Sequence, residues 1–326
     1  MKLIVQIPCF NEEECLPHVL EGIPRRLPGV DVVETLVVDD GSTDGTVQIA
    51  TELGVDHIIR HTRNQGLARS FRTGLDTCLS LGADLIVNTD GDNQYSGSDI
   101  PLLVEPILAG KADIVIGDRQ TNQVEHFPLA KRKLQALGSS VARRFSQIHI
   151  PDAVSGFRAM SREAALQINI VSAFSYTIEM LIQAGSKQLA VTSVPIRTNP
   201  VARPSRLFRS TPEFISRSAT TMLRIYSMYR PLSTFFFIGL ALGVVGLIPI
   251  VRFLYFYAIG QGGGHVQSLV LGGVLVTIGF IAFLVGLVAD LINFNRRLLE
   301  ITLEKVRRIE LELPVTGGAS RDTHEE

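Results

Sequence analysis

The sequence predicts an α/β domain with a mostly parallel sheet and flanking helices, followed by a C-terminal hairpin of two transmembrane helices. Two observations support this prediction. Short apolar, β-branched segments alternate with helical segments through the first 120 residues, as in chains that form parallel strands joined by helical crossovers. Two long apolar segments follow residue 230, and each is long enough to cross a hydrocarbon core of about 30 Å.

The expected strands end in polar residues, which indicates where a site would form. We expect strands at residues 2–7, 34–38, 57–59, 84–88, 113–116 and 191–196, and helices at residues 12–20, 45–53 and 66–81. Polar clusters follow Ile7, Val38, Asn88 and Ile116. Because ligands of open parallel sheets bind beyond the carboxyl ends of the strands, we expect these clusters to line one cleft.

The segment before the apolar region is strongly basic. Residues 197–230 contain seven Arg and a single acid, Glu213, with apolar side chains interleaved. This pattern is typical of amphipathic helices that lie on an anionic membrane surface. The solvated basic face of a soluble helix is the alternative, and a span that begins directly afterwards disfavours it.

The two spans are expected at residues 235–259 and 266–289, joined by a short connector. Buried core helices of a soluble protein are the alternative, although adjacent apolar runs of this length are rare in such proteins. The connector has no Lys or Arg, whereas basic residues flank the other ends of both spans: Arg224, Arg230, Arg296, Arg297, Lys305, Arg307 and Arg308. By the positive-inside rule, both termini face the cytoplasm.

The chain is therefore divided into four parts. We expect a globular cytoplasmic domain at residues 1–200, interface helices at 201–231, two transmembrane helices at 232–293, and a cytoplasmic helix with a disordered tail at 294–326. The net charge of −1 gives no reason to expect nucleic-acid binding. Glycines in both spans permit close helix packing, either within the hairpin or in a homo-oligomer.

Asp90 and Asp92, separated by Gly91, directly follow an expected strand. Two such carboxylates can share one Mg²⁺ or Mn²⁺ ion, which takes its other ligands from substrate phosphates and water. Gln94 could add an oxygen ligand. A lone pair of this kind is a weak signal, because most are exposed turns, but here it aligns with three other polar strand ends.

Polar residues after the first two strands suit a nucleoside. Asp40 precedes Gly41 at the end of the second strand, and a carboxylate there suits a base or ribose hydroxyl better than a phosphate, which it would repel. Asn11 and Glu12 could bond the same groups from the first strand. Helix capping is an equally available role for Asp40 and Asn11.

Taken in order, these segments resemble family 2 glycosyltransferases with the GT-A fold. They are Pro8 with Asn11 and Glu12, the Asp-Asp-Gly-Ser stretch after Val38, Asn64-Gln-Gly66, Asp90-Gly-Asp92 and Ser155-Gly-Phe-Arg158. The chain is most similar to the polyprenyl-phosphate glycosyltransferases, including dolichol-phosphate mannose synthases and the bacterial undecaprenyl-phosphate enzymes with a two-helix membrane hairpin. The resemblance covers roughly residues 5 to 206, and it implies a nucleotide-sugar donor, a polyprenyl phosphate acceptor and the bacterial inner (plasma) membrane.

The resemblance also implies roles for individual residues on the donor side. The nucleoside would be held by Pro8, Asn11, Glu12 and Asp40, with Asp90 also contacting the nucleotide. The metal ion and the diphosphate would be bound by Asp90, Asp92 and Gln94.

On the acceptor side, four arginines would face the acceptor phosphate: Arg119, Arg132, Arg203 and Arg206. Asp152 and the Ser-Gly-Phe-Arg segment would shape the sugar and acceptor side. The catalytic residues would be Asp92, Asp152 and Arg119. The loop with Arg203 and Arg206 departs from the family pattern, since it lacks the usual Gly and ends in Arg instead of Lys.

The chemistry favours the same acceptor independently. A lipid phosphate monoester is already anionic at neutral pH, so it needs cations more than a strong base. Transfer in one displacement would invert the anomeric configuration. A lipid hydroxyl such as that of diacylglycerol is the alternative acceptor, and it would need a base such as Asp152. A catalytically inactive membrane scaffold or sugar-nucleotide sensor is the alternative of another class.

Overall fold

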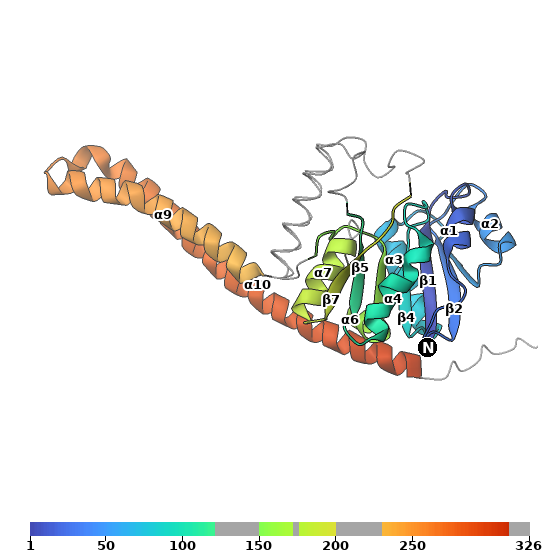
Figure 1. Ribbon diagram of the computed structural model, residues 1–326. Coiled ribbons are helices and arrows are strands. Elements are labelled where there is room, and N and C mark those ends of the chain that lie inside the picture. Colours follow the sequence, from blue (N-terminus) through green and yellow to red (C-terminus); the bar gives the residue numbers. More distant parts are fainter. Residues whose placement is uncertain (121–149, 172–175, 200–229, 313–326) are drawn as a thin grey trace, which may run out of the picture. The chain divides into compact units, whose positions relative to one another are not determined.

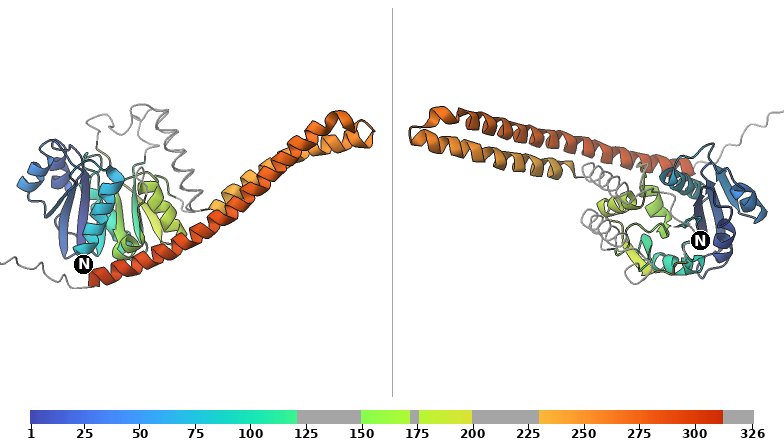
Figure 2. Two further views of the ribbon diagram at one scale, coloured as in Figure 1. Left: turned by 180° about the vertical axis from the view of Figure 1, so that it is seen from behind. Right: turned by 90° about the horizontal axis from the view of Figure 1, so that it is seen from above.

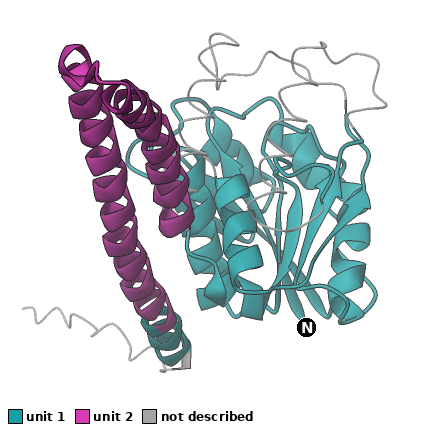
Figure 3. Ribbon diagram, turned by 90° about the vertical axis from the view of Figure 1, so that its left-hand side faces the viewer, with its two compact units in different colours: residues 1–211, 302–326 teal, residues 212–301 magenta. Residues whose placement is uncertain are grey.

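The computed structural model describes residues 1–120, 150–171, 176–199 and 230–312. The chain forms two compact units, residues 1–211 with 302–326 and residues 212–301 (Figure 3). The predicted interface helices, and with them Arg132, Arg203 and Arg206, lie outside the described residues.

Unit 1 is built on a seven-stranded sheet with the order β3-β2-β1-β4-β6-β5-β7 (Figure 1). The strands are β1 (Lys2–Cys9), β2 (Val32–Asp39), β3 (His57–Arg60), β4 (Leu85–Asn88), β5 (Ile114–Asp118), β6 (Arg158–Ser161) and β7 (Val191–Pro195). The helices are α1 (Leu16–Gly22), α2 (Thr46–Glu52), α3 (Leu67–Ser80), α4 (Ile100–Leu108), α6 (Arg162–Gln167) and α7 (Tyr176–Ser186), with a 3₁₀ turn, η1 (Gly97–Asp99).

Two apolar layers hold this sheet between its helices. On one face, side chains of β1, β2 and β4 pack against α3, α6 and α7, including Phe71, Leu75 and Met180. On the other face, alternate side chains of the same strands pack against α1 and α4, including Leu16 and Leu103. Helices on both faces explain why the central strands read as nearly continuous apolar runs. The predicted α/β class with flanking helices is confirmed.

One strand departs from the expected parallel pattern. Strand β6 runs antiparallel between β4 and β5, with Arg158 opposite Asn88. The sequence analysis expected no strand between residues 116 and 191, so it missed β6. Because β6 begins where β4 ends, the segment that enters it reaches the sheet at the carboxyl edge of the parallel strands. The Ser155–Arg158 stretch therefore lies beside the loop that follows β4.

The first helix is shorter than expected. The pattern predicts helix from residue 12, whereas α1 begins at Leu16, with Pro17 in its first turn. Residues 11–13 instead form a loop, and Asn11 adopts a left-handed backbone conformation with φ of 56°. Asn tolerates that conformation better than most residues do. The loop leaves its side chains and N–H groups available to the neighbouring β2 loop.

Unit 2 is a helical hairpin. It contains α9 (Pro231–Ala258), a short 3₁₀ turn η2 (Gly262–His265) and most of α10 (Val266–Glu312), which run side by side (Figure 2). Both helices are long and apolar enough to cross a membrane. Few of their apolar side chains are buried in the structure, unlike those of core helices in soluble proteins.

Glycines let the two helices of the hairpin approach closely. A Cβ atom at Gly239 would lie 2.6 Å from the carbonyl oxygen of Gly279, and one at Gly272 would lie 2.6 Å from that of Gly246. Gly243 and Gly273, in contrast, face open space. Packing within the hairpin thus accounts for four of the span glycines, and such close backbone contact is the usual role of small residues in membranes.

The end of α10 belongs to unit 1. The helix continues without a break through residue 294, where the sequence analysis placed a boundary, and its last turns contact the globular domain. Arg307 donates to Asp76 of α3 at 3.1 Å, and Arg308 pairs with Glu163 of α6. Leu311 packs against the core layer under α3. These contacts attach the C-terminal end of the helix to the domain.

Candidate active site

The loops after β1 and β2 are hydrogen-bonded to each other. The Asn11 N–H donates to the Ser42 hydroxyl at 2.9 Å, and the Asn11 side-chain oxygen accepts from the Thr43 N–H at 2.9 Å. Glu13 accepts from the Gly45 N–H at 2.7 Å. These contacts make the two loops one rigid wall at the carboxyl edge of the sheet. Asn11 thus bonds the backbone of another loop and does not cap α1, whose N-cap residue is Cys15.

Asp40 fixes the loop that precedes α3. Its carboxylate accepts hydrogen bonds from the N–H groups of Gln65 and Gly66, at 2.9 and 2.7 Å. A ring nitrogen of His61 lies 2.7 Å from the same carboxylate, and the other ring nitrogen lies 3.1 Å from the Thr73 hydroxyl. The sequence analysis missed this buried histidine as the support of Asp40. Polar residues just after a strand were the signal that located Asp40 itself.

The turn after Asp40 requires glycine. Gly41 has φ of 76°, and a Cβ atom there would lie 2.7 Å from the backbone carbon of Arg63. The left-handed conformation and the close approach both exclude larger residues. The 61–66 loop can therefore lie directly against the end of β2.

Asp90 is the most unusual carboxylate of the site. It follows β4, and its Oδ1 atom is buried without a hydrogen-bond partner. Burial raises the Asp90 pKa to about 7, with the nearby Asp92 carboxylate as the next cause. A buried polar atom without a hydrogen-bond partner is costly, so its presence requires a physical explanation. The arrangement fits a cation, which would supply that partner.

The rest of the Asp90–Gln94 loop lies against the end of β1. A Cβ atom at Gly91 would lie 2.9 Å from the Cys9 sulfur and 3.2 Å from the Glu12 side chain. Asp92 accepts a hydrogen bond from the Gln94 N–H at 3.1 Å, which closes a tight turn. The structure therefore brings Asp90, Asp92 and Glu12 together, as expected for neighbouring strand ends.

The donor set suits a metal that the substrate helps to bind. Within residues 1–120, 150–171, 176–199 and 230–312, no three His, Cys, Asp or Glu side chains gather closely enough to hold a metal by themselves. Asp90 and Asp92 supply two carboxylates, and Mg²⁺ is commonly bound by one or two carboxylates with substrate phosphates and water. The residues present thus fit Mg²⁺ or Mn²⁺ together with a diphosphate.

Arg119 and Asp152 form a largely buried ion pair near Asp90. The Arg119 Nε and Nη2 atoms donate to the two Asp152 oxygens at 2.6 and 3.0 Å. Burial opposes the charged form of Arg119, but interactions with Tyr95, Asp152 and Asp90 outweigh it and raise the pKa of the guanidinium. The fork that was expected to face an acceptor phosphate is thus engaged by Asp152 in this structure.

A polar network that the sequence analysis missed holds Gly156 against the Asp90 carboxylate. The Asn88 side chain donates to the Gly156 carbonyl at 2.8 Å and to the Tyr176 hydroxyl at 3.2 Å. The Gly156 N–H donates to the Tyr95 hydroxyl at 3.0 Å. A Cβ atom at Gly156 would lie within 3 Å of both Asp90 oxygens. Asn88, a polar residue that ends an apolar strand, was the only sequence signal for this network.

Arg158 is fully buried and contacts backbone rather than the cleft. It donates to the carbonyl oxygens of Ala153, Ser155 and Thr177 at 2.7, 2.7 and 2.8 Å. Burial lowers its pKa to about 10, so it stays charged at neutral pH. The sequence analysis placed this residue on the sugar and acceptor side. Its contacts instead hold the 153–155 loop and the start of α7 in place.

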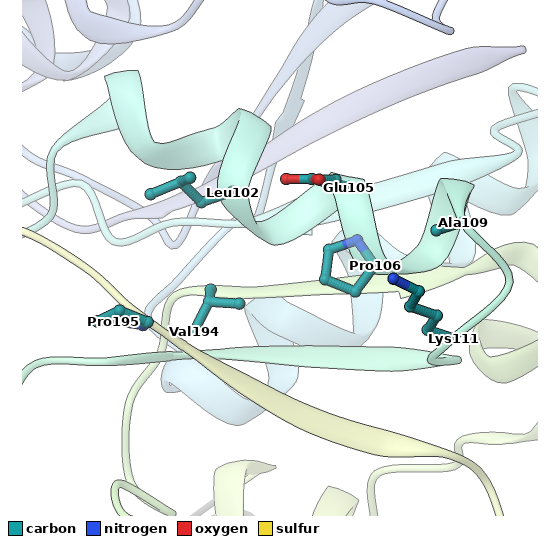
Figure 4. A pocket seen from close by; sticks show the side chains of 7 residues that line it. All are labelled: Leu102, Glu105, Pro106, Ala109, Lys111, Val194 and Pro195. Atoms are coloured by element: carbon teal, nitrogen blue, oxygen red, sulfur yellow. The ribbon is translucent and has the colours of Figure 1, made fainter.

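A hollow of about 270 Å³ lies elsewhere in the domain, between α4 and β7 (Figure 4). It is lined by Leu102, Glu105, Pro106, Ala109, Lys111, Val194 and Pro195. None of these is among the predicted site residues, so this hollow is separate from the carboxylate cluster.

Residues 4–168 match the model of the family described as glycosyl transferase family 2, which is half of the chain. The chain belongs to glycosyl transferase family 2. This confirms the resemblance read from the motifs, and it makes the region around Asp90 and Asp92 the candidate active site of a glycosyltransferase.

Two relatives illustrate how far the similarity extends. The polyprenol monophosphomannose synthase of Mycolicibacterium smegmatis is 29% identical over 60% of this chain and 76% of its own length. The glycosyltransferase AglJ of Haloferax volcanii is 28% identical over 93% of this chain and 95% of its own length. The second match therefore includes the helical hairpin as well as the globular domain of this family 2 member.

Among solved structures, glucosyl-3-phosphoglycerate synthase from Mycobacterium tuberculosis, in complex with Mn²⁺, UDP-glucose and phosphoglyceric acid, is similar in fold. The match has a TM-score of 0.54 and 21% identity, and it covers 69% of this chain and 80% of the other. The likeness confirms the predicted GT-A fold of this glycosyltransferase domain.

Replacing Asp90 with asparagine is expected to stabilise the metal-free glycosyltransferase at pH 8. The folded-state pKa of Asp90 is raised to about 7, above its ordinary value, so ionisation of Asp90 costs stability as the pH rises. Asparagine carries no such charge. Thermal denaturation in EDTA should give Asp90→Asn the higher midpoint at pH 8 and a smaller advantage at pH 5. Wild-type protein with the higher midpoint at pH 8 would contradict the assignment.

Proposed function

We propose that this glycosyltransferase moves a sugar from a UDP-sugar to a polyprenyl phosphate, with inversion, at the cytoplasmic face of the bacterial inner membrane. The observation that carries the proposal is the Asp90 carboxylate, whose buried oxygen lacks a partner beside Asp92 at the carboxyl edge of the sheet. Relatives that act on polyprenyl carriers and the apolar hairpin support the acceptor. UDP is preferred to GDP because the hairpin resembles that of the bacterial transferases.

On the donor side, Asp90, Asp92 and Gln94 would hold Mg²⁺ or Mn²⁺ with the diphosphate. The ion would act as a Lewis acid on the leaving diphosphate. The wall formed by the β1 and β2 loops would receive the nucleoside through Pro8, Asn11, Glu12 and Asp40. The raised pKa of Asp90 supports the assignment of the metal to this residue. A carboxylate that is costly to ionise alone is stabilised most by a neighbouring cation.

On the acceptor side, the phosphate is already an anionic nucleophile. One of its oxygens forms a bond to the anomeric carbon while the bond from that carbon to the nucleoside diphosphate breaks, so the configuration inverts. Arg119 would orient the phosphate with Arg132, Arg203 and Arg206. Asp152 holds Arg119 at 2.6 Å and fixes the direction of its fork.

Transfer to a lipid hydroxyl would make a different demand on the same residues. It requires Asp152 to remove a proton from the acceptor. The two-point contact with Arg119 opposes this, because both Asp152 oxygens already accept hydrogen bonds from the guanidinium. An inactive scaffold would have no use for a carboxylate held at a raised pKa.

Purified full-length protein in detergent tests the proposal directly. We expect a sugar-phosphate-lipid when the protein is incubated with Mn²⁺, undecaprenyl phosphate and the correct member of a panel of UDP- and GDP-sugars. Mass spectrometry identifies the product and the donor, and NMR of the anomeric centre reports inversion. Diacylglycerol serves as the competing acceptor. Turnover with diacylglycerol but not with the lipid phosphate would overturn the acceptor assignment.

A further inference from the structure

A short segment after β7 is paired with the loop that carries the candidate metal ligands. Tyr95 and Thr198 form an antiparallel bridge. Beside it, the Asn199 N–H donates to the Gln94 carbonyl at 2.9 Å, and the Ser96 N–H donates to the Arg197 carbonyl at 3.4 Å. Backbone hydrogen bonds on both sides of the bridge thus join residues 94–96 to residues 197–199, about 100 positions later in the chain.

The Asn199 side chain makes the contacts nearest to the ligands. Its Nδ2 atom donates to the backbone oxygen of Asn93 at 3.0 Å and to the side-chain oxygen of Asn93 at 3.2 Å. Asn93 has φ of 57°, a left-handed conformation that most side chains adopt only at a cost. Asn93 lies between Asp92 and Gln94, so Asn199 holds the left-handed residue of this turn.

An ion pair fixes the base of the same segment. The Arg197 backbone and Nε donate to the buried Asp99 carboxylate at 2.7 and 2.9 Å. Asp99 is 1% exposed and lies in the 3₁₀ turn before α4. Because this end is anchored, the Asn199 side chain is placed over Asn93 by a rigid support rather than by a free loop.

We propose that Asn199 is a positioning residue of the metal site. By holding the left-handed turn at Asn93, it sets how Asp92 and Gln94 face the cation that they share with Asp90. Mg²⁺ demands near-ideal ligand geometry, so small displacements of one ligand weaken binding. The inference rests on the proposed function, since it concerns the metal that the transferase would use.

The test measures metal affinity and loop protection rather than turnover. We expect Asn199→Ala to raise the Mn²⁺ dissociation constant about tenfold, as loss of a supporting residue around a metal does. Electron paramagnetic resonance of free Mn²⁺, with UDP present and full-length protein in detergent, gives the constant. Hydrogen exchange in the metal-free protein should become faster in peptides that cover residues 91–96.

Two further variants separate positioning from a loss of folding. Thr198→Ala is the matched control, because it changes the neighbouring side chain of the bridge and leaves the contacts to Asn93 intact; its Mn²⁺ affinity should match that of the wild type. Asn93→Ala removes the side-chain acceptor and makes the left-handed turn more costly. Because it removes the partner of Asn199, this variant should show the same loss of Mn²⁺ affinity as Asn199→Ala.

The outcomes distinguish this inference from the proposed function. Wild-type protein that binds no Mn²⁺ in the presence of UDP would overturn both. Wild-type binding that is matched by Asn199→Ala, with unchanged exchange at residues 91–96, would overturn the positioning role and leave the proposed function standing. Weaker binding by Asn199→Ala and Asn93→Ala, but not by Thr198→Ala, would support it.

Discussion

Replacing Asp92 with alanine is expected to lower kcat/KM for sugar transfer by about a thousandfold, which corresponds to about 4 kcal/mol of transition-state stabilisation. Asp92 and Asp90 are the two carboxylates that the structure places at the carboxyl edge of the sheet after β4. Without Asp92 the leaving diphosphate would lose most of the charge compensation that the proposed cation would provide. Initial rates with undecaprenyl phosphate and a nucleotide-sugar measure the effect.

The fold should tolerate the loss of Asp92. Its side-chain hydrogen bond in the structure is to the Gln94 N–H, within a partly exposed turn. Asp92→Asn keeps an oxygen for that bond while it removes the charge, so it serves as the matched variant. Both variants should lose activity with little change in thermal midpoint. An Asp92→Asn protein that retained full activity would exclude a metal-binding role for this carboxylate.

Replacing Arg158 with methionine is expected to lower the free energy of unfolding of the globular domain by about 3 kcal/mol or more. Hydrogen bonds to charged groups contribute about 1.5–3 kcal/mol each, and three carbonyls would be left without their donor. All three partners are within 2.8 Å in the folded protein. For a domain of this size, the thermal midpoint should fall by roughly 10 °C, as measured by circular dichroism.

Arg162 offers the matched control for Arg158. It also donates to two backbone carbonyls, those of Leu79 and Ala83, but it is partly exposed, so water can replace it. Arg162→Met should therefore lower the free energy of unfolding clearly less than Arg158→Met does. Arg158→Lys keeps the charge but not the planar fork, and it should fall between the two. Equal losses for Arg158→Met and Arg162→Met would show that burial of the three carbonyls is not what makes Arg158 important.

The motif that contains Arg158 shows where sequence reasoning stopped. The structure places the Ser-Gly-Phe-Arg stretch beside the loop after β4. The role of its arginine was assigned to the sugar and acceptor side. The structure shows that Arg158 contacts carbonyls of residues 153, 155 and 177 instead. No local pattern could reveal this, because the Thr177 carbonyl belongs to helix α7 and comes within reach of Arg158 only when the chain is folded.

Asp40 and Asn11 illustrate the same limit at the other end of the site. Their place at strand ends followed from the alternation of apolar and polar residues. Their hydrogen-bond partners did not, because those partners are N–H groups of other loops at residues 43, 65 and 66. A backbone donor has no sequence signature, so the pairing depends on how the loops meet.

The sequence by itself determined that the chain has an α/β domain and an apolar helical hairpin, and that the carboxylates follow the ends of strands. The evidence consisted of strand and helix periods, a family-specific order of short motifs and two long apolar segments. Each of these is a local property, so it can be recognised in the sequence without knowledge of the fold. Only the tertiary structure decided what surrounds those carboxylates. The antiparallel strand β6, the bond from Asn199 to Asn93 and the orphaned oxygen of Asp90 all arise from contacts between residues far apart in the chain. Burial and long-range pairing set the pKa of Asp90 and the rigidity of its loop, and neither can be read from the order of residues alone.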